Sequence, residues 1–158
     1  IENTGSNSKL LIAGSRQYQY YDELILKTIE RLSIIENVKL LGSVSKKDLR
    51  DLYSNCNFII FPSPFENFAY TLAEAMSCGA AIACSNTTAM PETCEDAAIY
   101  FDPYNTNEMA EKIILLISDK NIRKSLKNKS LARADELPDY KEVTYKTLQI
   151  INNLASIS

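Results

Sequence analysis

Short apolar runs alternate along the chain with segments in which apolar residues recur every three or four positions. The first three runs are KLLIAG (9–14), VKLLG (38–42) and NFIIFPS (57–63), and each ends at or beside a glycine or a proline. Two more follow, AAIACS (80–85) and AAIYFD (97–102). Continuous apolar runs of this length are typical of strands buried on both faces of a parallel sheet.

The segments between these runs predict helices. Residues 21–32 carry an apolar stripe of helical period, and residues 45–56 open with Ser45 as an N-cap and Asp48 as a first-turn acid. Residues 70–78 are followed by Gly79, which is typical of a helix C-terminus. Three later helices are predicted at 107–117, 119–134 and 139–158, of which the last closes the chain.

Strands and helices alternate throughout, the connections are short and no internal repeat is present. This order predicts one α/β domain over residues 1–158, a doubly wound, Rossmann-like fold around a parallel sheet. Ligands of such sheets bind outside the carboxyl ends of the strands. The loops that follow Gly14, Gly42 and Pro62 are therefore the candidate site.

Composition narrows the function without defining it. The 158 residues carry a formal net charge of -3, which gives no electrostatic reason to expect nucleic acid as a partner. Histidine is absent, so this chain supplies no histidine catalysis and no histidine metal ligand. No apolar run reaches the roughly 18 residues of a membrane span. The opening IENTGSNSK is not a signal peptide, and we expect the sequence to be a fragment of a longer protein.

The four cysteines form no C-x-x-C pair, which disfavours a zinc knuckle or a redox motif. Cys56, Cys78 and Cys84 have apolar neighbours and are expected to be reduced core residues, whereas Cys94 is expected in an exposed polar loop. Reduced cysteines favour a cytoplasmic location.

Two carboxylates flank the predicted strand-to-helix turn in FENFAYTLAE. Glu66 precedes the helix and Glu74 lies about one turn inside it. A helix N-terminus favours phosphate, whereas carboxylates accept hydrogen bonds from hydroxyl groups. A ligand with hydroxyl-rich ends and a phosphate middle would fit, which describes a nucleotide sugar. The alternative, which spacing alone leaves open, is that the acids only oppose the helix dipole.

Several stretches in this order resemble one family. They are LLIAG (10–14), the segment from Asn37 to Ser63, Glu66-NFAYTLA-Glu74 with the following AMSCG, and PETCEDAAIYFDPYN (91–105). Together they are similar to the C-terminal, donor-binding domain of retaining family 4 glycosyltransferases, which is one half of a GT-B fold. The resemblance covers nearly the whole chain.

The resemblance implies roles for individual residues. Glu66 would contact the donor sugar at the catalytic centre, and Glu74 would hold the ribose hydroxyls. The remaining donor-binding positions are the mouth of the cleft, the nucleobase contact and the backbone amides at the helix start: Gly14, Ser43, Val44, Phe68, Ala69, Tyr70 and Thr71.

The reaction implied by the resemblance is transfer of a sugar, with retention, from a nucleotide-sugar donor to a saccharide or lipid-linked acceptor. UDP is favoured over GDP because it is the commoner donor nucleotide in the family. No metal ion or other cofactor is expected, and the chain has no D-x-D. The implied setting is bacterial polysaccharide, O-antigen or glycolipid (lipopolysaccharide) synthesis at the inner face of the cytoplasmic membrane.

The chain departs from the family in two ways. Glu66-Asn67-Phe68-Ala69 stands where the family often has Glu-Gly-Phe-Gly. The family's diphosphate-binding Arg and Lys follow a first strand that would precede LLIAG, and Arg16 is no obvious substitute. With that strand and the N-terminal acceptor domain outside the sequence, this chain alone is expected to be inactive. Its expected partners include its own N-terminal domain, through which a peripheral membrane contact is expected.

Three alternatives share parts of this pattern. An enzyme like UDP-N-acetylglucosamine 2-epimerase would need further catalytic acids and a histidine, which the chain lacks. A non-catalytic nucleotide-binding module remains open. A dinucleotide-dependent dehydrogenase is disfavoured because no G-x-G-x-x-G follows any predicted strand.

Overall fold

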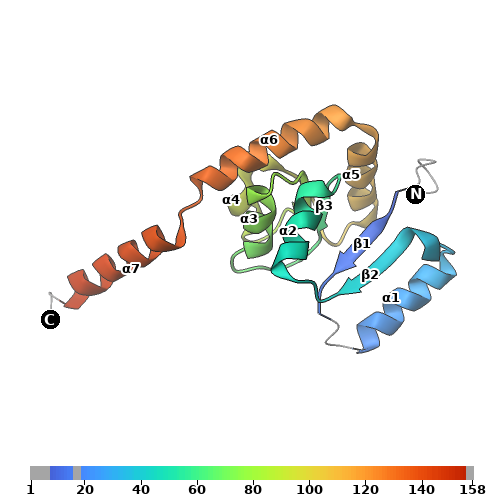
Figure 1. Ribbon diagram of the computed structural model, residues 1–158, viewed down its shortest axis with the longest axis horizontal. Helices are drawn as coiled ribbons and strands as arrows, with labels where there is room; N and C mark the ends of the chain where they lie inside the picture. The colour runs from blue at the N-terminus through green and yellow to red at the C-terminus, as the bar shows by residue number, and fades with distance from the viewer. Residues whose placement is uncertain (1–7, 16–18, 156–158) are drawn as a thin grey trace.

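The computed structural model of the protein describes residues 8–15 and 19–155 (Figure 1). The strands are β1 (Leu10–Ala13), β2 (Val38–Gly42), β3 (Ile59–Phe61), β4 (Ile82–Ser85) and β5 (Ala98–Phe101). The α-helices are α1 (Gln19–Arg31), α2 (Lys46–Asn55), α3 (Tyr70–Ser77), α4 (Met90–Cys94), α5 (Thr106–Ser118), α6 (Lys120–Glu136) and α7 (Tyr140–Ala155). Two 3₁₀ helices, η1 (Ile35–Asn37) and η2 (Glu95–Ala97), complete the described elements. The α/β order is confirmed, whereas α4 and the 3₁₀ helices were not predicted.

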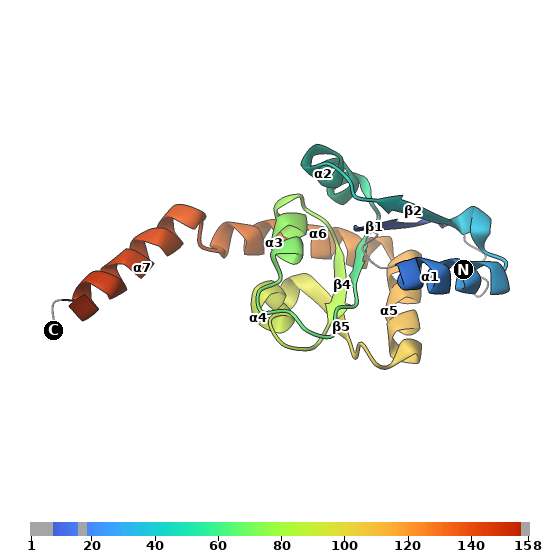
Figure 2. The same cartoon turned by 90° about the horizontal axis from the view of Figure 1, so that it is seen from below.

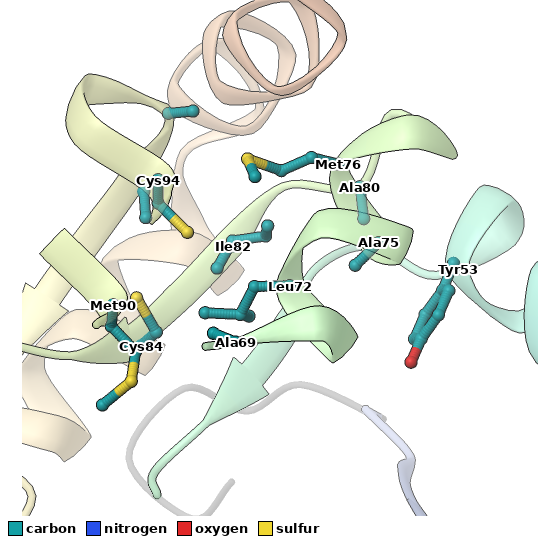
Figure 3. Close-up of a cluster of buried hydrophobic side chains, with 12 residues drawn as sticks. Tyr53, Ala69, Leu72, Ala75, Met76, Ala80, Ile82, Cys84, Met90 and Cys94 are labelled. Atoms are coloured by element: carbon teal, nitrogen blue, oxygen red, sulfur yellow. The ribbon is translucent and has the colours of Figure 1, made fainter. Parts of the chain in front are cut away.

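Strand β4 is the centre of the fold. All four of its residues are buried, and it pairs in parallel with β3 on one side and β5 on the other. Ile82 and Cys84 face a cluster formed with α2, α3 and α4, whereas Ala83 belongs to a second cluster with α5 and α6. Figure 2 shows helices on both sides of this sheet, and Figure 3 shows the first cluster. The doubly wound arrangement is therefore confirmed.

The strands do not form one sheet, and the prediction of a single parallel sheet is wrong in this respect. β1 pairs with β2, with Leu10 opposite Val38, and β3, β4 and β5 form a separate sheet. Among the described strands, β1 and β3 are each paired along one edge. Leu10 and Leu11 are consequently 41% and 46% exposed although their sequence is that of a buried strand. Hydrophobic patterning identifies a strand but not its neighbours.

Helix α3 is short and is held by its C-terminal end. Gly79 follows the helix with φ of 68° and donates its N–H to the Met76 carbonyl at 2.8 Å, as the sequence predicted for a C-terminal glycine. The next carbonyl, that of Ala80, accepts a hydrogen bond from the buried Ser130 hydroxyl of α6 at 2.7 Å. The end of α3 and the start of β4 are thus fixed to α6.

The closing helix predicted from the sequence is confirmed as α7, which extends away from the rest of the fold (Figures 1 and 2). Its described side chains are all exposed. The apolar ones are Val143, Tyr145, Leu148, Ile150, Ile151 and Leu154. Across the part of the chain that the structure describes, no helix combines the length and the apolar character needed to cross a bilayer.

Replacing Ser130 with alanine tests the link between α6 and β4. The variant leaves the buried Ala80 carbonyl without its donor, which should lower the free energy of unfolding by about 1–3 kcal/mol. Urea unfolding followed by circular dichroism measures this change. Ser125→Ala, on the exposed face of the same helix, is the matched control and should leave stability unchanged. Equal midpoints for the two variants would contradict the assigned role of Ser130.

Candidate functional site

The loop of residues 62–69 joins β3 to α3 at the carboxyl edge of the central sheet. Its last residue, Ala69, is buried and packs in the core cluster, which fixes the start of α3. No side chain caps this helix. The Tyr70 N–H donates to the Phe68 carbonyl at 2.9 Å, so of the four amides proposed from the sequence this one is already engaged. The Leu72 N–H likewise donates to the Ala69 carbonyl at 2.9 Å, so an anion at the start of α3 would meet only part of the first N–H groups of the helix.

Glu66 lies within this loop and is half-buried. Its backbone N–H donates to the Thr88 hydroxyl at 3.1 Å, and the nearby Pro64 carbonyl accepts from the Thr87 hydroxyl at 3.0 Å. Both threonines belong to the turn between β4 and α4. The turn between β4 and α4 thus helps to set the conformation of the loop that carries Glu66.

Glu74 projects from α3 into a pocket of about 260 Å³ between α2 and α3. The pocket combines two cations, one carboxylate, a phenol and apolar surface, and its lining residues are Lys46, Leu49, Arg50, Tyr53, Glu74, Ser77 and Cys78. Burial raises the pKa of the Tyr53 hydroxyl, and the negative charge of Glu74 raises it further. Tyr53 therefore stays protonated and can donate a hydrogen bond at neutral pH.

The structure does not bring the two proposed acids into one pocket. Glu74 lines the α2–α3 pocket, whereas Glu66 is not among its lining residues. Phe68 and Tyr70 lie between them in the chain, and their rings pack at 4.6 Å with an interplanar angle of 59°. Both aromatic side chains are exposed, at 43% and 72%, and Thr71 beside them is also exposed.

The loop that follows Gly42 leads into helix α2, which lines the same pocket. The Gly14 N–H donates to the Gly42 carbonyl at 2.9 Å, so the ends of β1 and β2 lie side by side. Gly42 has φ of 67°, a left-handed conformation that favours glycine. Exposed Ser43 and half-buried Val44 then run into α2, which packs against α3.

Helix α2 begins as the sequence predicted. Ser45 is its N-cap: the hydroxyl accepts from the Asp48 N–H at 3.1 Å and donates to the Asp48 carboxylate at 2.7 Å. The structure thus places Gly42, Ser43 and Val44 directly before the helix that lines the pocket. Arg16 lies outside the described residues.

Sequence reasoning missed the cationic wall of the pocket. Lys46 and Arg50 are not among the candidate site residues named from the sequence, although both side chains, exposed to solvent, line the pocket. Lys46, Arg50 and Tyr53 recur at intervals of four and three residues, which places them on one face of α2. That spacing was available in the sequence, but it does not reveal that the face meets α3.

The prediction that Cys94 is exposed is wrong. Cys94 ends α4 and is fully buried in the core cluster that also holds Cys84 of β4. The neighbouring Cys94 sulfur and burial raise the pKa of the Cys84 thiol, so Cys84 stays neutral. Polar residues around Cys94 in the sequence, among them Glu92 and Glu95, suggested a loop although the helix buries one side.

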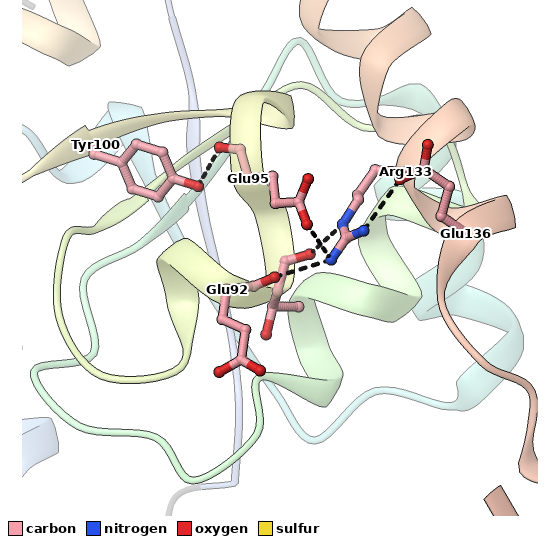
Figure 4. Close-up of polar contacts among 6 residues, drawn as sticks. Glu92, Glu95, Tyr100, Arg133 and Glu136 are labelled. Atoms are coloured by element: carbon pink, nitrogen blue, oxygen red, sulfur yellow. Dashed lines mark hydrogen bonds and ion pairs between the residues drawn. The ribbon is translucent and has the colours of Figure 1, made fainter.

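Arg133 of α6 fastens α4 and η2 to the domain (Figure 4). Its guanidinium donates to the carbonyls of Glu92 and Thr93 at 3.0 and 3.1 Å, and pairs with the carboxylates of Glu95 at 2.9 Å and Glu136 at 3.1 Å. Glu95 has φ of 45°, which is uncommon outside glycine. The arginine side chain is only 16% exposed, so this network holds the segment that follows the threonine turn.

The fold is the Rossmann-like fold of one half of a GT-B glycosyltransferase. A glycosyltransferase from Rickettsia africae superposes with a TM-score of 0.86 over 99% of this chain and 42% of its own, at 18% identity. Residues 1–133 match the family described as Glycosyl transferases group 1. The chain belongs to this family.

Two curated relatives are enzymes of the same kind. The O-antigen chain mannosyltransferase B of Escherichia coli is 31% identical over 127 residues, which are 80% of this chain and 33% of that protein. A Campylobacter jejuni protein is 30% identical over 129 residues, 80% of this chain and 34% of its own length. It is the N-acetylgalactosamine-N,N'-diacetylbacillosaminyl-diphospho-undecaprenol 4-alpha-N-acetylgalactosaminyltransferase. The chain thus spans about one third of the length of each of these two relatives.

Substituting Arg133 with lysine tests the network around α4. A lysine keeps the charge but cannot donate to two carbonyls and two carboxylates in the planar arrangement of a guanidinium. We expect the free energy of unfolding to fall by about 1–3 kcal/mol in chemical denaturation. Lys129→Ala removes the exposed Lys129–Asp96 pair of the same region and should leave stability unchanged. A larger effect at Lys129 than at Arg133 would contradict this account.

Proposed function

We propose that this chain is the C-terminal, nucleotide-sugar-binding domain of a retaining glycosyltransferase. The observation that carries the proposal is the placement of Glu74 in a pocket beside the start of α3, in a chain of this family. Glu74 would accept hydrogen bonds from the ribose hydroxyls of the donor nucleotide. Val44 and Ser43 would lie against the base, since they lead directly into the helix that forms the opposite wall.

The diphosphate and sugar would lie over the start of α3. Phe68, Ala69 and Thr71 offer backbone N–H groups there, and the helix dipole favours negative charge. Glu66 would meet hydroxyls of the donor sugar from the preceding loop, with the Tyr70 amide freed only if its bond to Phe68 opens. Gly14 would line the mouth of the cleft.

The donor and acceptor classes rest on the relatives. One transfers mannose in O-antigen synthesis and another acts on a diphospho-undecaprenol-linked acceptor, as their names state. For this chain we propose a saccharide or lipid-linked acceptor in bacterial surface polysaccharide synthesis, at the cytoplasmic face of the membrane. UDP as the donor nucleotide stays a prediction, with GDP as the competing base. Independence from metal ions and other cofactors also stays a prediction.

The unpaired strand edges support a larger assembly. Strand β1 pairs in parallel with β2, and strand β3 pairs in parallel with β4. Among the described strands, the other edge of β1 and the other edge of β3 are unpaired. One further parallel strand between them would join both sheets in the order β2, β1, new strand, β3, β4, β5. This would cover the exposed Leu10 and Leu11, and it agrees with the first strand that the resemblance implies. The apolar side of α7 would likewise pack on the proposed N-terminal acceptor domain.

Transfer is favoured over the alternatives by the relatives, both of which are glycosyltransferases. An epimerase-like enzyme or a non-catalytic nucleotide-binding module would share the nucleotide site. A sugar-transfer assay on the longer protein separates these possibilities, because only a transferase forms a new glycosidic product.

Glu74→Gln tests the nucleotide site. The substitution keeps the size of the side chain but weakens its hydrogen bonds to ribose hydroxyls, so UDP or GDP binding should weaken by about 1–3 kcal/mol. Amide NMR titration of the 158-residue chain with UDP and, separately, GDP measures the affinity and identifies the base. Shifts are expected near residues 42–45 and 66–75. Glu111→Gln, at an exposed position of α5, is the control, and equal affinities for both variants would overturn the role of Glu74.

The isolated 158-residue chain is expected to transfer no sugar. The acceptor site and the basic residues for the diphosphate would lie on segments beyond this sequence. A radiolabelled UDP-glucose or GDP-mannose assay, with a lipid-linked saccharide acceptor, measures transfer by the chain and by a longer form that adds the N-terminal region. Transfer by the short chain at the rate of the longer form would show that the proposed domain division is wrong.

A further inference from the structure

The turn between β4 and α4 holds the loop that carries Glu66. The Glu66 N–H donates to the Thr88 hydroxyl at 3.1 Å, across 22 positions of sequence. The Thr87 hydroxyl donates to the Pro64 carbonyl at 3.0 Å. In the described chain these are the hydrogen bonds that tie the backbone of residues 63–68 to another part of the fold. Within the loop, the Ser63 hydroxyl donates to the Phe65 carbonyl at 3.1 Å.

Thr88 adopts a conformation that its side chain disfavours. Its φ is 50°, and a β-branched residue with positive φ is a genuine outlier. Such a conformation is strained and persists where the surroundings enforce it, often at functional sites. Ser33 and Glu95, the other described non-glycine residues with positive φ, are not β-branched.

The surroundings of the turn are rigid. On its N-terminal side Ser85 is fully buried, and the Asn86 N–H donates to the Phe101 carbonyl of β5 at 2.9 Å. On its C-terminal side Met90 and Cys94 are fully buried in the core cluster that Figure 3 shows. Thr87 and Thr88 therefore lie between buried residues of β4 and α4. The loop that they contact is more exposed, and its Phe65 side chain is 66% exposed.

We propose that Thr88 is a positioning residue that sets the conformation of the Glu66 loop for the sugar half of the donor. The proposal rests on the proposed function, in which Glu66 contacts the donor sugar and Glu74 the ribose. Thr88 acts through the Glu66 backbone and touches no substrate. The Thr88 hydroxyl accepts a hydrogen bond from the Glu66 loop and does not line the α2–α3 pocket. Loss of the hydroxyl therefore affects binding of the sugar rather than of the nucleotide.

Two substitutions isolate the hydroxyl. Thr88→Val keeps the β-branched shape and the backbone strain but removes the acceptor for the Glu66 N–H. Thr88→Ser keeps the hydroxyl and should restore the wild-type behaviour. Thr147→Val makes the same chemical change on exposed α7, where the hydroxyl donates only to the Val143 carbonyl, and is the control.

The test compares four probes, UDP, GDP, UDP-glucose and GDP-mannose, titrated into the 158-residue chain and followed by amide NMR. For the base that binds, Thr88→Val should weaken nucleotide-sugar binding about fivefold, the loss expected for one hydrogen bond, and leave nucleotide binding unchanged. The Glu66 amide resonance should shift and exchange faster with solvent in Thr88→Val, but not in Thr88→Ser or Thr147→Val.

Each other outcome has a distinct meaning. Equal weakening of nucleotide and nucleotide sugar by Thr88→Val, or no weakening of either, would overturn the positioning role while leaving the nucleotide site in place. Failure of Thr88→Ser to restore binding would overturn it as well. A wild-type chain that binds none of the four probes would instead overturn the proposed function itself, and the role of Thr88 with it.

Discussion

Parallel pairing of β4 on both of its edges is the constraint on which the described fold depends. Ile82 and Cys84 fill one layer of the core, and Ala83 fills the other. The hydroxyl of the buried Ser85 also lies within 3.5 Å of the Phe61 carbonyl, at the end of β3. The loops after β3 and β4 therefore leave the sheet from fixed points. The positions of the loops at the carboxyl edge of the sheet therefore depend on how β4 pairs with β3 and β5.

The two carboxylates of the proposed site are held in place by different kinds of contact. Glu74 stands on a helix that is packed between α2 and α6, so its position is set by the core. Glu66 stands on a loop whose position is set by two hydroxyl contacts. In the proposed function the nucleotide half of the donor would contact Glu74 on helix α3. The sugar half would contact Glu66 on the loop of residues 62–69.

Much of this architecture was available in the sequence. Apolar runs located the five strands, and Ser45 and Gly79 marked helix ends with the hydrogen bonds expected of them. Helix α4 was missed because it has five residues, MPETC, too few to show a helical stripe. Its brevity also explains the error at Cys94, whose burial comes from the core cluster that it shares with β4 and α3 rather than from neighbours in the chain.

The remaining features are properties of tertiary contact. Separation of β1 from β3 could not be predicted because an apolar run does not specify which strand lies beside it. The same holds for Arg50, since a charged residue on a helix faces solvent in most proteins and lines a pocket only when another helix lies opposite. The contact of Thr88 with Glu66 joins two loops, and no periodicity links them.

Helix α7 differs from the other described elements in how its sequence can change. The core restrains Ser130 and Arg133 of the preceding helix, and the match to the family ends at residue 133. Beyond Leu137, which still packs against the core, the described side chains belong to neither core cluster. The apolar side chains of α7 thus contribute to neither core cluster, so the packing of the described domain places no demand on their sequence.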